Sequence, residues 1–130
     1  MVPLPKEIEQ YLEEMAANFK RGTTEMLLLA LLKDGDQYAY ELSKALKKKS
    51  KGLFDIQGPT LYTALYRLQS HGFVSTREEQ AGRRIRVYYH LLPSGEEYLR
   101  RVWAVYQSVG AGVLSVMVET DLSEQEEDAT

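Results

Sequence analysis

Residues 59–68 read PTLYTALYRL, and they are followed by HGFV at residues 71–74 and by AGRRIRVYYHL at residues 81–91. In the first segment Leu61, Leu65 and Leu68 recur at the spacing of one helix face. Pro59 stands at the first helical position, where its missing N–H costs nothing, and His71-Gly72 follows as a stop signal. The segment therefore predicts an amphipathic helix with a polar and aromatic outer face.

The period of the pattern changes after this helix. Residues 73–78 and 84–91 are rich in β-branched and aromatic side chains, and the second run alternates apolar and polar positions. Such alternation is typical of a half-buried strand, whose inward positions here would be Ile85, Val87, Tyr89 and Leu91. Residues 80–83 join the two runs, so we expect a hairpin with arginines at its tip.

Helical patterns surround this unit on both sides. Residues 4–20 carry one apolar stripe, residues 24–34 are apolar nearly all round, and residues 37–49 end in a run of lysines. A helix that is apolar on every face normally forms the centre of a core, and we expect residues 24–34 to do so. The S-x-x-E pattern of Ser94 to Glu97 predicts a capping box that opens a last helix, which runs to about residue 118.

Composition excludes several classes of protein. The chain has 130 residues, 44% hydrophobic and 27% charged, as expected for one soluble domain. It has no cysteine, which excludes disulfides, thiolate zinc sites and cysteine nucleophiles, and His71 and His90 lack metal-ligand spacing. Its longest purely apolar run, Met26–Leu32, falls short of the ~20 residues of a membrane span, and no secretory signal is visible. We expect a cytoplasmic protein with no membrane, metal or cofactor partner.

The net charge of −3 conceals an asymmetry along the chain. Residues 1–19 carry a charge of −3 and residues 102–130 a charge of −6, whereas residues 20–101 hold fifteen Lys and Arg against nine Asp and Glu. A basic centre between acidic ends indicates a polyanionic partner for the centre alone. A lysine-rich solvated helix face would produce the same numbers, so charge by itself leaves both interpretations open.

The order of helices followed by an arginine-tipped hairpin is that of a winged helix-turn-helix, a mainly α, α+β fold. Groups on the outer face of the 59–68 helix have the size and chemistry to reach base edges in a major groove ~12 Å wide. Arginine's planar fork suits phosphate at the hairpin, and lysines at a helix end bind phosphate without reading sequence. The predicted DNA contacts are Thr60, Tyr62, Thr63, Tyr66, Arg67, Lys47, Lys48, Lys49, Gly82, Arg83, Arg84 and Arg86, with Lys51 beside the lysine run.

Over residues 24–101 the sequence resembles the PadR family of transcriptional regulators. The T-L-Y-x-x-L-x-R-L helix followed by G-R-R-x-x-x-Y-Y carries the resemblance, together with the segment DGDQYAYEL at residues 34–42. It implies a homodimeric winged-helix repressor that binds a pseudo-palindromic operator and often responds to a small-molecule inducer. One departure is Leu92-Pro93, where the family usually has Leu-Thr, and Ser94 is expected to take over the capping role.

A single helix with an apolar stripe after the hairpin cannot bury itself against one small domain, which favours a partner chain. We expect dimer or ligand contacts from Ile8, Leu12, Met15, Phe19, Leu99, Val102, Trp103, Tyr106, Val109 and Val113. Trp103 is either an anchor of this interface or a platform on which a flat inducer stacks. The predicted organisation is a dimer-contact helix (1–22), a winged-helix DNA-binding domain (23–92), a dimerisation helix (93–118) and a disordered acidic tail (119–130).

Two other functions compete with a DNA-binding repressor. Winged helices also serve as protein–protein interaction modules, which bind duplex DNA weakly and without a steep salt dependence. An enzyme is disfavoured, because the sequence presents no nucleophile–base pair, phosphate-binding loop or metal cluster and hence no candidate catalytic residue.

Overall fold

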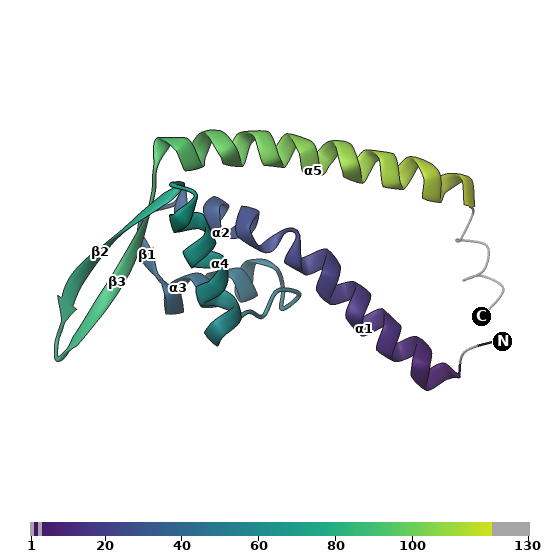
Figure 1. Cartoon of the computed structure of the whole chain (residues 1–130), viewed down its shortest axis with the longest axis horizontal. Coiled ribbons are helices and arrows are strands. Elements are labelled where there is room, and N and C mark those ends of the chain that lie inside the picture. Colours follow the sequence, from purple (N-terminus) through teal and green to yellow (C-terminus); the bar gives the residue numbers. More distant parts are fainter. Residues whose placement is uncertain (1, 3, 121–130) are drawn as a thin grey trace. The chain divides into compact units, whose positions relative to one another are not determined.

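The computed structural model describes Val2 and residues 4–120 of the chain. The elements follow in the order α1 (Pro5–Arg21), α2 (Thr24–Leu32), β1 (Gln37–Tyr38), α3 (Ala39–Lys49), α4 (Gly58–Ser70), β2 (Val74–Ala81), β3 (Arg84–Leu91) and α5 (Pro93–Thr120) (Figure 1). The strands form one antiparallel sheet in the order β1-β3-β2. This is the predicted winged-helix fold, with the hairpin β2–β3 as the wing.

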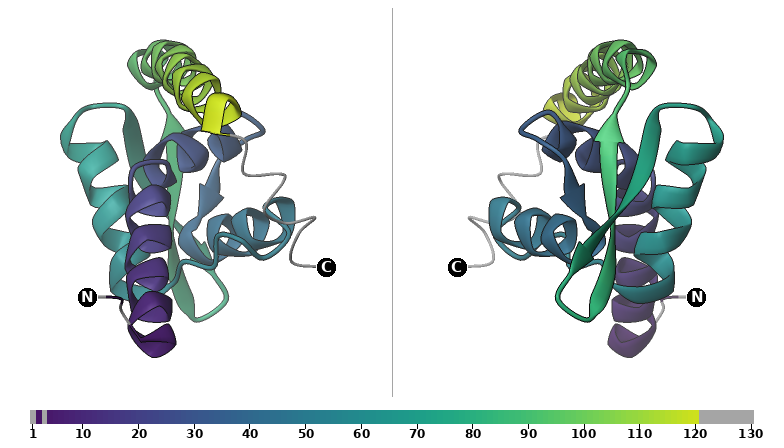
Figure 2. Two further views of the ribbon diagram at one scale, coloured as in Figure 1. Left: turned by 90° about the vertical axis from the view of Figure 1, so that its right-hand side faces the viewer. Right: turned by 90° about the vertical axis from the view of Figure 1, so that its left-hand side faces the viewer.

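The core lies where α2, α3 and α4 meet the base of the sheet (Figure 2). As predicted, α2 is its centre, since Leu28 and Leu29 are fully buried. Helix α3 contributes Leu42 and α4 contributes Leu65, both fully buried as well. Leucines from three helices thus exclude water from one shared interior, the dominant favourable contribution to folding.

The start of α3 differs from the prediction. Gln37 and Tyr38 form a short strand that pairs with Tyr89 and Tyr88 of β3, and the helix begins at Ala39. The extended backbone of Tyr38 pairs with Tyr88 in the sheet, and its N–H donates to the Glu41 carboxylate at 3.3 Å. Sheet pairing with residues fifty positions away therefore displaces the first turn expected at Gln37.

The wing is longer and more exposed than predicted. Strand β2 continues to Ala81, so that only Gly82 and Arg83 form the turn, and Gly82 adopts a φ of 63° that favours glycine. Ile85 and Val87 were expected to face the core, but they are 62% and 39% exposed. The reason is visible in Figure 1, where the distal half of the hairpin extends past the helices.

The prediction of a capping box at Ser94 is wrong. Helix α5 already begins at Pro93, and the Ser94 hydroxyl donates at 2.6 Å to the Gly72 carbonyl, which ties the helix start to the end of α4. At its other end α5 includes Glu119 and Thr120, which were assigned to the tail, and residues 121–130 lie outside the described part of the chain. The described residues divide into two compact units, with the boundary between Leu99 and Arg100.

Candidate nucleic-acid interface

The outer face of α4 carries the predicted base-reading side chains. The helix buries Leu61, Ala64, Leu65 and Leu68, and this leaves Thr60, Tyr62, Thr63 and Tyr66 exposed on the remaining surface. Tyr62 and Tyr66 are 57% and 70% exposed. Hydroxyl groups and planar rings at these positions are free to meet the edges of base pairs.

Arg67 lies in the last turn of α4, and its surroundings differ from those of the other four residues. Its Nε donates at 3.1 Å to a carboxylate oxygen of Glu25 in α2. The guanidinium group is therefore partly neutralised within the protein, which distinguishes Arg67 from the exposed polar groups of the same helix.

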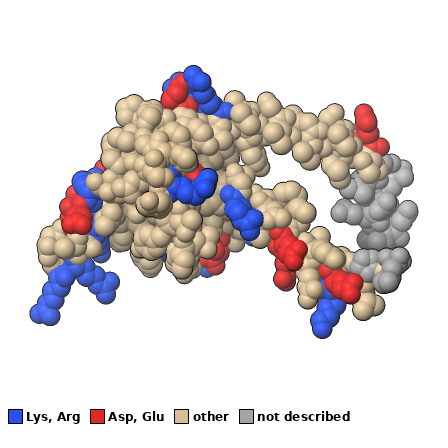
Figure 3. Space-filling view, in the orientation of Figure 1, with Lys and Arg blue, Asp and Glu red and all other residues tan. Residues whose placement is uncertain are grey.

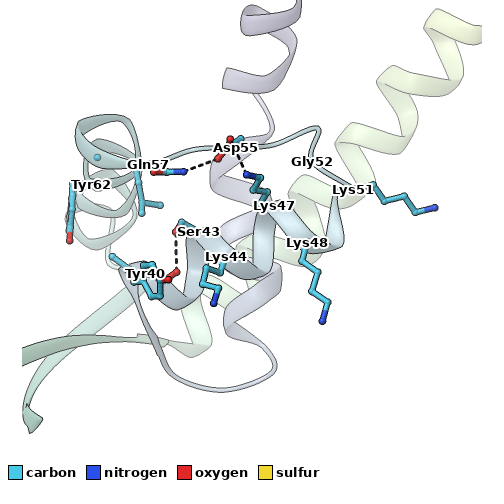
Figure 4. Close-up of a pocket in the computed structure, with 13 residues that line it drawn as sticks. Tyr40, Ser43, Lys44, Lys47, Lys48, Lys51, Gly52, Asp55, Gln57 and Tyr62 are labelled. Atoms are coloured by element: carbon cyan, nitrogen blue, oxygen red, sulfur yellow. Dashed lines mark hydrogen bonds and ion pairs between the residues drawn. The ribbon is translucent and has the colours of Figure 1, made fainter.

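A basic groove of about 750 Å³ lies between α3 and the beginning of α4 (Figure 4). The groove is open to solvent on one side. Four of its lining residues are lysines, namely Lys44, Lys47, Lys48 and Lys51. The first turn of α4 has no side-chain cap, since the Gln57 amide donates to Asp55 at 3.0 Å instead. A helix N-terminus and ammonium groups both favour an anion.

The three lysines predicted to bind DNA at residues 47–49 do not all line this groove. Lys47 and Lys48 line the groove, and Lys47 also lies 3.5 Å from Asp55. Lys49 does not line the groove, because it pairs with Asp34 at 3.0 Å. Lys44 replaces it and was missed, although the spacing 44, 47, 48 and 51 is that of one helix face and would have identified it.

The wing carries the other predicted cations. Arg83 in the turn and Arg84 at the start of β3 are exposed, and Figure 3 shows positive side chains extending from the tip of the hairpin. Arg86 also lies on β3, but its guanidinium carbon is 4.5 Å from the centre of the Tyr38 ring. The two arginines of the tip are therefore extended into solvent, whereas the Arg86 guanidinium is held against the Tyr38 ring of β1.

Sequence reasoning missed a charged cluster at the base of the wing. Asp36 precedes β1, and its carboxylate accepts hydrogen bonds from Arg77 of β2 and, at 2.7 Å, from Nδ1 of His90 of β3. Because a carboxylate only accepts, Nδ1 of His90 must carry the proton. The His90 hydrogen bond, followed by that of Arg77, holds the pKa of Asp36 below its ordinary value of 3.8, although burial opposes the shift.

This lowered pKa makes a prediction about acid stability. A carboxyl group whose pKa is lower in the folded chain stabilises the fold above its ordinary value of 3.8, and that contribution is lost as the pH falls through the folded pKa. Replacing Asp36→Asn should therefore lower the free energy of unfolding at pH 7. The difference from the wild type should narrow as the pH falls below 3.8. Urea unfolding measured at pH 7, 4 and 3 tests this, and a difference independent of pH would contradict it.

Eight of the ten predicted dimer contacts are exposed, and the other two are Val102 and Leu99. On α1, which has no buried residue, Ile8, Leu12, Met15 and Phe19 are between 44% and 71% exposed. On α5, Trp103, Tyr106, Val109 and Val113 are between 48% and 59% exposed, and Val102 is half-buried. Leu99 is buried within residues 1–99, so its assignment to the dimer surface is corrected.

Trp103 and Tyr106 are stacked on one another along α5. Their ring centres are 5.7 Å apart and their planes differ by 12°. A flat aromatic surface of two rings thus lies on an exposed helix. The observation is compatible with both expectations for Trp103, the interface anchor and the ligand platform.

By length and composition α5 could cross a membrane, with a mean hydropathy of 1.3 over its most apolar window. The sequence argument considered only uninterrupted apolar runs and therefore did not detect this helix. Among the described residues, no group of His, Cys, Asp and Glu has the arrangement of a metal site.

Comparison with known proteins agrees with this geometry. The sequence model of the "Transcriptional regulator PadR-like family" matches residues 28–101. A PadR family transcriptional regulator from Eggerthella lenta is 28% identical and superposes with a TM-score of 0.78, over 86% of this chain and 96% of the other. A transcriptional regulator from Clostridium thermocellum is 28% identical with a TM-score of 0.72, over 75% and 96% of the two chains. An uncharacterized protein of Lysinibacillus sphaericus is 26% identical over 68% of this chain and 85% of its own length.

Proposed function

Because the chain belongs to the PadR-like family of transcriptional regulators, which bind DNA and are not enzymes, we propose that it is a homodimeric repressor released from its operator by a small molecule. One observation carries the proposal. The exposed hydroxyl and aromatic face of α4 occurs in the same unit as an arginine-tipped wing and a lysine-lined groove. Base-reading groups are thus combined with cations that bind phosphate.

In the proposed complex α4 enters the major groove, where Thr60, Tyr62, Thr63 and Tyr66 read base edges. Because Glu25 holds Arg67, we leave Arg67 out of this set. The tip arginines bind phosphates or the neighbouring minor groove, and Gly82 shapes their turn. Lys44, Lys47, Lys48 and Lys51 bind phosphates at the beginning of α4.

The proposal of a homodimer rests on the exposed apolar side chains of α1 and α5. Val102, Tyr106, Val109 and Val113 follow one face of α5, and Val105 and Val116, at 59% and 65% exposure, widen it. A face this broad is an association surface rather than an ordinary solvated one. Two copies also place two α4 helices on a pseudo-palindromic operator with half-sites ~34–36 Å apart. We therefore propose that protein covers α5 in a cytoplasmic dimer, rather than lipid.

We propose that a small-molecule inducer binds at the stacked rings of Trp103 and Tyr106. Flat aromatic molecules gain from offset stacking on such rings. A ligand bound there would act on the dimer, and so on the spacing of the two α4 helices. The same two rings would serve as interface anchors if the regulator had no ligand.

Fluorescence anisotropy tests the DNA-binding function. The wild-type protein should prefer the duplex from upstream of its own gene over a scrambled duplex by a factor of ~10³ or more at one stated salt concentration. Equal binding to both duplexes would indicate a regulator of another site. Binding to neither would favour the alternative, a winged-helix module for protein–protein interaction.

Replacing Arg83 and Arg84 together by alanine should weaken binding to every duplex on the order of tens of fold at physiological salt. The slope of log K against log salt should become shallower by nearly 2, since each lost phosphate contact removes about 0.9. Lys49→Ala is the matched control, because Lys49 pairs with Asp34 outside the groove. An unchanged slope in the double variant would refute the assignment of the wing.

A further inference from the structure

Arg86 forms an unusual contact for a side chain on an exposed strand. Its direct cross-strand neighbour is Glu79 of β2, the partner with which an ion pair would be expected. The Glu79 carboxylate instead accepts from Nε of Arg77 at 3.0 Å. The guanidinium of Arg86 lies over the ring of Tyr38, outside its own hairpin.

The nearby acids are both engaged by Arg77. Asp36 and Glu79 each bind its guanidinium group, and Arg77 also lies 5.0 Å above the Tyr88 ring. Within the described part of the chain no carboxylate forms an ion pair with Arg86. Arg77 is thus a structural cation, whereas the charge of Arg86 remains available to an external anion.

Tyr38 is itself fixed in place by its neighbours. Its backbone pairs with Tyr88 of β3, and it immediately precedes α3. Its ring meets Tyr88 edge-on at 5.5 Å between centres and stacks with Tyr40 at 6.4 Å. A ring held by the sheet and by the start of α3 offers Arg86 a rigid platform, and it links the wing to the helices that carry the groove.

We propose that Tyr38 is a positioning residue for DNA binding, which holds Arg86 by a cation–π contact so that its charge meets the phosphate backbone where β1 pairs with the wing. The inference rests on the proposed DNA-binding function and deepens it. It divides the cations of the wing into two kinds. Arg83 and Arg84 at the tip adapt to the duplex, whereas Arg86 is ordered before binding and loses less side-chain entropy when it binds.

A double-mutant cycle tests the coupling by anisotropy on one duplex. Tyr38→Leu should weaken binding about three- to five-fold, the range typical of an exposed cation–π contact. In an Arg86→Gln background the same change should have almost no effect, because the cation that it positions is absent. Tyr38→Phe keeps the ring face and should restore wild-type binding.

Two further variants complete the design. Tyr98→Leu removes a ring that stacks with Phe73 rather than with Tyr38 or Arg86, so it should change binding by the same factor in both backgrounds. Arg86→Lys affects an exposed side chain and keeps its charge but loses the planar stacking surface, so binding should fall as with Tyr38→Leu. It tests the contact even if Tyr38→Leu folds poorly.

The outcomes separate this inference from the function on which it rests. An equal loss for Tyr38→Leu in both backgrounds, or full binding by both Tyr38→Leu and Arg86→Lys, would overturn the inference and leave a DNA-binding regulator. A wild-type protein that binds no duplex would overturn both. Loss only in the background that contains Arg86, with rescue by phenylalanine, would support the proposed positioning role.

Discussion

Replacing Val109 by glutamate is expected to convert the proposed dimer to a monomer and to weaken operator binding about a hundredfold or more. Val109 lies in the middle of the apolar face of α5 and is 59% exposed in the single chain. In a dimer a carboxylate at this position would be desolvated among apolar side chains without a partner. Loss of the second copy removes the avidity of two linked half-sites, which is worth 10²–10⁴ in affinity.

Ser108→Glu is the matched control for this change, since it adds the same charge one position along α5 but away from the apolar face. Size-exclusion chromatography with light scattering would measure the mass of both variants, and anisotropy would measure operator binding. A Val109→Glu protein that remains a dimer would exclude this face of α5 as the dimer interface. Monomeric Val109→Glu beside dimeric Ser108→Glu would establish it.

Replacing Gly95 by alanine is expected to lower the free energy of unfolding by about 3 kcal/mol, at the upper end of the usual range for overpacking. A Cβ atom at this position would lie 2.2 Å from the Phe73 carbonyl oxygen and 2.8 Å from Cδ1 of Leu91. The Phe73 carbonyl cannot move freely, because it accepts the Leu92 N–H at 3.0 Å. The start of α5 would have to separate from the strand on which it packs.

Thermal unfolding followed by circular dichroism would show a decrease in Tm of roughly 10 °C for Gly95→Ala. The control is Gly112→Ala in the same helix, where an added Cβ meets no atom within 4 Å. This control should be neutral or raise the stability by up to about 1 kcal/mol, because alanine favours a helix. Equal Tm values for Gly95→Ala and the wild type would show that the contact relaxes without cost.

Most of the residues proposed to face DNA could be identified as exposed from the sequence, because their positions depend on local periodicity. The spacing of Leu61, Leu65 and Leu68 specifies the buried side of α4, and the outer positions follow from the helix geometry. Likewise a glycine followed by arginines between two β-rich runs places the cations at the tip of a hairpin. The same periodicity assigned the stripe on α5, although it could not show that Leu99 belongs to the core of its own chain.

The sequence was sufficient for the order of the helices and the hairpin, the winged-helix class and the exposed face of α4, because each of these depends on side chains within about two helical turns or one hairpin of each other. It was not sufficient for β1, which forms by pairing with β3. The tertiary structure alone decided which cations are engaged within the protein. Glu25 engages Arg67 from 42 residues away, Asp36 engages Arg77 from 41 residues away, and Tyr38 lies beneath Arg86. These contacts form only when distant strands and helices pack together, so no local pattern encodes them.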